Sequence, residues 1–298
     1  MVDRKGKLKA SVLMLLPFTT VFTVFVLIPI VVAIVLSFTY FNMLNIPRFV
    51  GLDNYIRMFT DDSVFPIAVK NTLIFAVLTG PLGFFLSFFF AWLINELPRS
   101  IRSVLTLMFY APTLAGNVYF IWLFIFSGDA YGFVNSTLMQ LGILTEPVRW
   151  LSDTRYMMAV VVIVMLWLSM GSGFLSLIAG LQNMDRSLYE AGCVDGISNR
   201  WQELWHITIP QMIPQMLFAA VMSISASFSV GYQSMALTGF PSTDYAAHTM
   251  VLHIYDIGSV RFEMGYASAL AVVLFLAMVL SWGGINKLLR KMGGMIDE

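Results

Sequence analysis

The sequence contains few charged residues for its length. Only 11% of its 298 residues are Asp, Glu, Lys or Arg, whereas 58% are hydrophobic. Soluble domains carry about 25% charged residues, so a soluble fold of this size would lack the polar groups to cover its surface. The composition therefore excludes an ordinary soluble protein and predicts an integral membrane protein.

Other absences narrow the possible functions. Because 17 basic residues are balanced by 17 acidic ones, the chain lacks the positive excess with which nucleic-acid-binding proteins neutralise phosphates. Its single cysteine, Cys193, excludes an intramolecular disulfide and a cluster of thiolate metal ligands. A glycine-rich phosphate loop is also missing, so ATP and Mg would have to be bound by another polypeptide. We expect no cofactor and no metal on this chain.

Six long hydrophobic runs predict the fold. Each is at least about as long as the 20 residues that cross the hydrocarbon core as a helix, and none alternates like a barrel strand. The runs are residues 11–39, 70–94, 103–127, 156–180, 215–238 and 264–286. The first is too long for the hydrophobic part of a cleaved signal peptide, so we expect it to be retained. The predicted fold is an all-α integral membrane protein with six transmembrane helices.

The Lys and Arg residues predict the orientation of these helices, because cytoplasmic connections are enriched in them. With the N-terminus inside, the inner side holds 11 of the 17 basic residues and the outer side holds 6. Residues 1–10 and 287–298 are then cytoplasmic tails, and residues 11–286 form one membrane domain. The longest inner connection is residues 181–214.

This connection begins with the pattern of a short amphipathic helix. Asp185 is a suitable N-cap for it. Leu188, Ala191 and Val194 follow at the spacing of one helix face. Gly196 is expected to end the helix or to permit a sharp turn.

A second helical stretch follows at roughly 198–207. Ser198 and Asn199 are its possible caps, and Pro210 and Pro214 limit its continuation. The apolar side of this helix–turn–helix can either lie on lipid headgroups or dock onto a partner protein. From the pattern alone, both alternatives remain open.

The same connection contains Glu190-Ala191-Gly192, then Gly196 after three further residues, and later Ile207-x-Ile209-Pro210. With these residues it resembles the EAA loop of permease subunits in binding-protein-dependent ABC importers. Gly192 and Ile209 replace the Ala and Leu of the family pattern, and one extra residue separates Gly196 from Ile207. The resemblance implies that the loop couples the membrane domain to an ATPase. The residues that it assigns to this role are Glu190, Ala191, Gly192, Asp195, Gly196, Ile207 and Pro210.

Other segments resemble the carbohydrate-importing branch of this family, of which maltose permease is the familiar member. They include residues 49–55, 110–112 and 265–269. The end of the chain lacks the Phe-Val-x-Gly tail of the second permease type and so resembles the MalF-like type. The resemblance implies the type I ABC importer permease fold in a bacterial or archaeal plasma membrane. It also implies a second permease subunit in a heterodimer, two cytoplasmic ATPase subunits, an extracellular sugar-binding protein, and a sugar or oligosaccharide substrate.

Polar residues on three predicted helices offer the hydroxyl, amide and aromatic groups that bind a sugar. They are Tyr110, Thr113 and Asn117 in the third run, Ser169 and Ser172 in the fourth, and Ser225, Ser229, Tyr232 and Gln233 in the fifth. The runs contain almost no ionisable residues, which argues against a proton- or ion-coupled carrier. Small polar residues are also common helix–helix contacts in membranes, so that alternative stays open for each of them.

Two other functions remain as alternatives. In a secondary carrier or channel subunit for a small polar solute, the inner loop would merely lie on lipid. A membrane-embedded enzyme would need catalytic side chains at depth, and the runs contain neither paired aspartates nor His-Glu-x-x-His. We therefore expect a transport subunit without catalytic residues. Asp244 and His248 are spaced to share a metal, but two ligands do not make a site.

Overall fold

The computed structural model describes residues 4–292, with side chains described for residues 13–287. In this part of the chain the regular structure is helical apart from one two-stranded ribbon. The predicted cytoplasmic tails, residues 1–10 and 287–298, lie partly outside the described residues. Helix α1 (Arg4–Phe22) includes the described part of the first tail, and helix α16 (Met264–Met292) includes the described part of the second.

The described residues contain four helices that are long and apolar enough to cross a membrane, and up to six spans if each of two bent pairs is one span. The four are Leu13–Leu36, Phe65–Asn95, Thr154–Gln182 and Met264–Lys287; the bent pairs are Arg99–Leu114 with Tyr119–Ile125 and Arg200–Gln211 with Ile213–Phe228. The predicted all-α membrane fold is confirmed. The chain separates into two compact units, Met1–Asp62 with Ile254–Phe275 and Ser63–His253 with Leu276–Glu298, which we describe one at a time.

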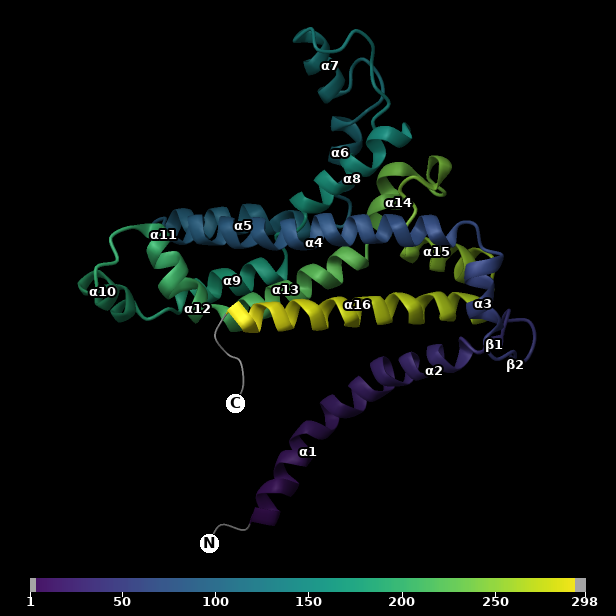
Figure 1. Cartoon of the computed structure of the whole chain (residues 1–298), viewed down its shortest axis with the longest axis horizontal. Helices are drawn as coiled ribbons and strands as arrows, with labels where there is room; N and C mark the ends of the chain where they lie inside the picture. Colours follow the sequence, from purple (N-terminus) through teal and green to yellow (C-terminus); the bar gives the residue numbers. More distant parts are fainter. Residues whose placement is uncertain (1–3, 293–298) are drawn as a thin grey trace. The chain divides into compact units, whose positions relative to one another are not determined.

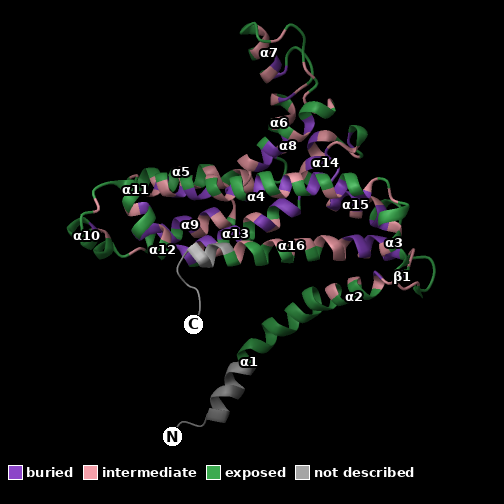
Figure 2. Ribbon diagram, in the orientation of Figure 1, coloured by how far each residue is buried: buried purple, intermediate pink, exposed green. Residues whose placement is uncertain are grey.

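The first unit begins with a long helical segment. It consists of α1, a π-helical turn (Thr23–Leu27) and α2 (Ile28–Leu36). The π turn lies just before Pro29, which has no N–H to donate to the preceding turn. The described residues of its own unit bury none of the span Leu13–Leu36 (Figure 2), so within this unit its apolar surface is open to lipid or to another membrane helix.

The end of this segment is fastened to the next elements of the same unit. These are β1 (Thr39–Tyr40), which pairs antiparallel with β2 (Arg48–Phe49), then α3 (Asp53–Thr60) and, later in the chain, a π turn (Asp256–Val260) and the start of α16. The buried Asn54 amide of α3 donates to the carbonyl oxygens of Ser37 and Thr39 at 2.8 and 2.9 Å. Arg57 of α3 forms an ion pair with Glu263, which binds α3 to the residues just before α16.

The second unit is built around α4, which packs against α9 and α13 (Figure 1). Its helices are α4 (Phe65–Asn95), α5 (Arg99–Leu114), α6 (Tyr119–Ile125), α7 (Phe133–Gln140), α8 (Thr154–Trp167), α9 (Ser172–Gln182), α10 (Arg186–Val194), α11 (Arg200–Glu203), α12 (Ile209–Gln211), α13 (Ile213–Phe228) and α14 (Tyr232–Thr238), with a π turn (Leu204–Thr208), a 3-10 turn (Thr243–Tyr245) and most of α15 (Met250–Tyr255).

Small residues let the three central helices approach closely. A Cβ atom at Gly173 of α9 would lie 3.1 Å from the Cα of Ala219 of α13. One at Gly83 of α4 would lie 2.9 Å from the Cβ of Ser169. Buried side chains such as Phe174 and Met216 fill the space beside these contacts. Such close packing is the main attraction between helices in lipid, where burial of apolar surface gives little.

Three of the predicted helical runs contain an interruption, one of them within the span Thr154–Gln182. Residues 115–118 separate α5 from α6, which are bent by 91°; residues 168–171 separate α8 from α9, and residues 229–231 separate α13 from α14. Pro112 precedes the first break, and Gly171 and Gly231 end the other two. An apolar run shows that a segment can lie in lipid. It does not show that the backbone hydrogen bonds of a helix continue through the segment, so the runs did not reveal the breaks.

Candidate functional site

The EAA-like loop, residues 181–214, begins with the helix that its sequence predicts. The Asp185 carboxylate caps α10 by accepting the Ser187 backbone N–H at 2.9 Å. This hydrogen bond, with one from the Ser187 side chain, lowers the pKa of Asp185. At the other end Gly196 has a φ of +92°, and the Ile197 N–H donates to the Gly192 carbonyl at 2.9 Å. This is the Schellman arrangement, which needs a left-handed residue at the position of Gly196.

One face of α10 is apolar and uncovered. Leu188, Ala191 and Val194 are all exposed, and Val194 retains 88% of its accessible surface. Glu190 is also exposed. The helix therefore presents an apolar stripe beside a carboxylate, and both are exposed among the residues that the structure describes.

The two halves of the loop meet at Gly192. A Cβ atom there would lie 2.7 Å from the Cδ1 of Ile207 and 3.1 Å from that of Ile197, so a glycine allows the halves to approach. The Tyr189 hydroxyl and the Thr208 Oγ1 form a second connection at 2.9 Å. Gly192 and Ile207, both predicted to be coupling residues, are thus buried between the halves and not on the exposed face. Sequence reasoning missed the connection between Tyr189 and Thr208, because no local pattern pairs residues so far apart.

The second half of the loop is longer than predicted. Asn199 caps α11 by accepting the Gln202 N–H at 2.9 Å. Helical backbone continues past Pro210 to Gln211. Proline has no N–H to donate to the preceding turn, and the π turn Leu204–Thr208 changes the hydrogen bonding there so that this N–H is not needed. The bend of 80° comes after that, before α13.

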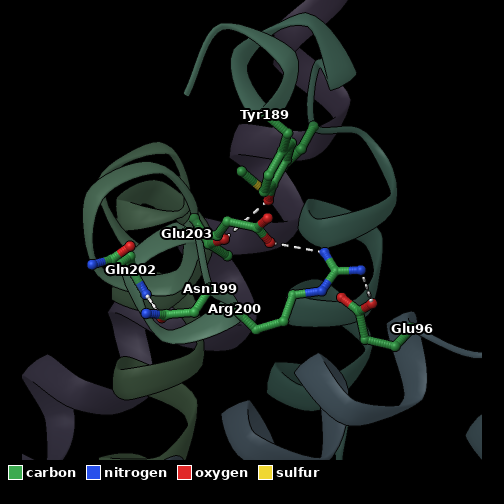
Figure 3. A network of polar contacts seen from close by, with 8 residues as sticks. Glu96, Tyr189, Asn199, Arg200, Gln202 and Glu203 are labelled. Carbon is green, nitrogen blue, oxygen red and sulfur yellow. Dashed lines mark hydrogen bonds and ion pairs between the residues drawn. The ribbon is translucent and has the colours of Figure 1, made fainter. Parts of the chain in front are cut away.

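A polar cavity of about 430 Å³ lies between this loop and the ends of α4, α5 and α9. Arg200 is held between two carboxylates (Figure 3): its Nη1 lies 2.8 Å from Glu203 Oε2 and its Nη2 lies 3.1 Å from Glu96 Oε2. Glu190 and Tyr189 of α10 also line the cavity. The sequence contains no signal for this cluster, since Glu96 is more than a hundred residues from its partner.

A second, smaller cavity of about 130 Å³ lies in the middle of the helices, beside the break between α8 and α9. Ser169 and Ser172, two predicted path residues, line it. Its remaining hydroxyl groups were missed by the sequence analysis and belong to Thr79, Ser87, Ser223 and Ser227. Several of these groups bond to helix backbone, as Ser223 does to the Gly80 carbonyl at 2.8 Å. They therefore also serve helix packing.

The other predicted path residues lie at or near the breaks and do not gather in this cavity. Asn117 is exposed in the turn between α5 and α6, and Ser229 is exposed after α13. Tyr232 is 55% exposed and its ring centroid lies 5.8 Å from that of Tyr119. Gln233 accepts the Gly231 N–H at 3.1 Å. Tyr110, Thr113 and Ser225 are half-buried on α5 and α13.

Asp244 and His248 do not form part of a metal site in the region that the structure describes, where no three His, Cys, Asp or Glu side chains gather. The His248 ring is buried between aromatic neighbours, with ring centroids at 6.0 Å for Phe240 and 5.1 Å for Tyr245. It has the surroundings of a packing residue.

Comparison with known proteins identifies the class of this membrane protein. Residues 81–292 match the model of the family described as binding-protein-dependent transport system inner membrane component. The chain belongs to this family. It is 31% identical over 274 residues to the lactose transport system permease protein LacF of Rhizobium radiobacter, which covers 89% of each chain. It is 29% identical over 276 residues to the arabinooligosaccharides transport system permease protein AraP of Bacillus subtilis, covering 92% of this chain and 86% of that one.

Solved structures give the same fold. A chain of a bacterial ABC transporter involved in the import of the acidic polysaccharide alginate matches with a TM-score of 0.73 and 26% identity, covering 96% of each chain. The fold is that of an ABC importer permease, and the chain is a permease subunit of a multi-pass membrane transport system. A secondary carrier or channel is not favoured.

Proposed function

We propose that this chain forms half of a sugar path across a bacterial or archaeal plasma membrane. The other half would be a second permease subunit, and two cytoplasmic ATPase subunits would bind ATP and Mg. An extracellular binding protein would deliver the sugar or oligosaccharide. The relatives named for lactose and arabinooligosaccharides support a saccharide as substrate.

The observation that carries the coupling role is the exposed face of α10. A stripe of Leu188, Ala191 and Val194 next to the exposed Glu190 suits a groove with an apolar floor and a basic rim. The cap at Asp185 and the left-handed Gly196 make α10 a short, stiff element, which passes rigid-body motion onward where a flexible loop would absorb it. We assign Glu190, Ala191 and Val194 to contact with the ATPase, and Gly192, Ile207 and Pro210 to the shape of the loop.

The helix breaks support the path assignment. Irregular backbone at membrane depth is tolerated where it is buried in protein or lines a cavity, and its free N–H and C=O groups can bind a polar substrate. Asn117, Ser229, Tyr232 and Gln233 lie at two of the breaks. Ser169 lies within the third, and Ser172 follows it directly. These hydroxyl, amide and aromatic groups match the chemistry of a saccharide.

An uptake measurement tests the function. A strain lacking this chain is compared with one carrying it, using labelled mono- and oligosaccharides, with an ATPase inhibitor and separately with an uncoupler. We expect one saccharide whose uptake requires this chain and follows ATP. Uptake that follows the proton gradient, or no saccharide that responds, would contradict the proposal.

A further inference from the structure

Apart from its covalent ends, the EAA-like loop is attached to the membrane helices in its second half. Leu204 is buried in a core cluster with residues of α4 and α9, and α11 touches the C-terminal end of α4. The Arg200 guanidinium pairs with Glu96, the C-cap residue of α4, and the Trp201 ring lies 5.5 Å from the Trp92 ring between centroids. We call these two contacts the α4–α11 link.

Glu203 holds the arginine of this link in place. Its carboxylate is only 16% exposed and lies one helical turn from Arg200, at 2.8 Å (Figure 3). Arg200 itself is 63% exposed and Glu96 42% exposed. Ion pairs with so much solvent contact contribute little to stability, so the pair of Arg200 and Glu96 is poorly explained as a device that keeps the chain folded.

Its position points to a different role. On one side, α11 continues into the π turn that contacts α10 through Ile207 and Thr208. On the other side, α4 supplies Thr79 and Ser87 to the small cavity among the central helices. The link therefore stands between the exposed face of α10 and a helix that walls the cavity.

We propose that Arg200 and Glu96 are positioning residues that make α11 and α4 move as one body. Displacement of α10 by an ATPase then shifts α4 and with it one wall of the cavity. This proposal rests on the proposed function, because it assumes that α10 is the element that the ATPase displaces. Neither residue contacts the substrate.

The first test measures sugar taken up per ATP hydrolysed, in vesicles containing the complete transporter with its binding protein. Glu96→Gln and Arg200→Gln should each lower this ratio about two- to fivefold, the range expected for losing an exposed charged pair. The double variant should lose no more than the worse single variant, because both changes break one contact. Arg99→Gln, which removes an exposed charge from the start of α5, is the matched control and should leave the ratio unchanged.

A second test restores the link chemically. In a Cys193→Ser background, Glu96→Cys/Arg200→Cys is bridged with a short bifunctional thiol reagent, and each single-cysteine variant serves as control. Bridging should raise the lowered ratio towards that of the unaltered chain. Bridging that abolishes uptake would show that α11 and α4 must separate, and it would overturn the proposal, as would single variants with unchanged ratios. Unaltered vesicles without any ATP-dependent uptake would instead contradict the proposed function.

Discussion

At the scale of single residues, some positions of the EAA-like loop determine its shape, and others are exposed for contact with a partner. Gly192 is buried and sets the distance between the two halves, whereas Val194 two residues later is almost fully exposed. Substitutions at these neighbouring positions should therefore fail in different ways. One should disturb the loop itself, and the other should disturb only what binds to it.

Gly192→Val is expected to disrupt the loop. A valine would place branched carbon atoms where the Cδ1 of Ile207 already lies 2.7 Å from a Cβ position. Overpacking of this kind costs about 1–3 kcal/mol, enough to lower ATP-driven uptake about tenfold. Gly192→Ala is the matched control, because the tip of the Ile207 side chain can move aside for one methyl group, and its uptake should stay within about twofold. Equal uptake by the two variants, at equal amounts in the membrane, would contradict this account of Gly192.

Val194→Asp is expected to weaken binding of the ATPase without unfolding the chain. The side chain is 88% exposed, so a carboxylate there remains solvated in the free permease. In an apolar groove it would be desolvated without a partner, which should reduce the affinity about tenfold or more. The measurement is binding of purified ATPase subunit to the solubilised permease, with the exposed Cys193→Ser as control. Unchanged affinity would favour the alternative in which this face lies on lipid.

The structural roles of some loop residues could be predicted from the sequence, and those of others could not. The Asp185 cap and the Gly196 turn follow from contacts within a few residues, and both were predicted. The inward position of Gly192 and the pairing of Arg200 with Glu96 depend on segments brought together by the fold. One sequence contains no record of such long-range partners.

At the scale of elements, the broken helices matter most. The apolar runs located the spans well, because length and hydropathy are what a bilayer selects. They could not locate the breaks after Leu114, Trp167 and Phe228, since a break within an apolar run changes hydrogen bonding and not composition. The path residues were expected on three helices, and most of them lie at or beside interruptions of these helices.

Asn117→Ala and Gln233→Ala test whether these interruptions bind the substrate. Each variant removes an amide at a break, and loss of a hydrogen bond to a sugar hydroxyl costs about 0.5–1.5 kcal/mol. We expect the KM for uptake to rise about two- to tenfold, with little change in the amount of protein in the membrane. Asn183→Ala, at the exposed C-cap of α9 within the EAA-like loop, is the control and should leave KM unchanged. If both path variants keep the original KM, the breaks do not form the binding surface.

At the scale of the whole molecule, the proposed orientation remains a prediction from the distribution of Lys and Arg. It has a direct consequence: the EAA-like loop must lie on the cytoplasmic side, and residues 128–155 on the outer side. The single cysteine makes the test simple. Cys193 is exposed on α10, and Tyr131, in the outer connection, is 90% exposed.

A thiol reagent that cannot cross the membrane should therefore leave Cys193 unlabelled in intact cells and label it after the membrane is opened. Tyr131→Cys in a Cys193→Ser background should give the opposite result and react in intact cells. Expression without the ATPase subunits removes protection of α10 by a bound partner, so only the membrane can account for missing reactivity. Labelling of Cys193 in intact cells would place α10 on the wrong side for any contact with a cytoplasmic ATPase. That result would contradict both the proposed orientation and the coupling role of α10.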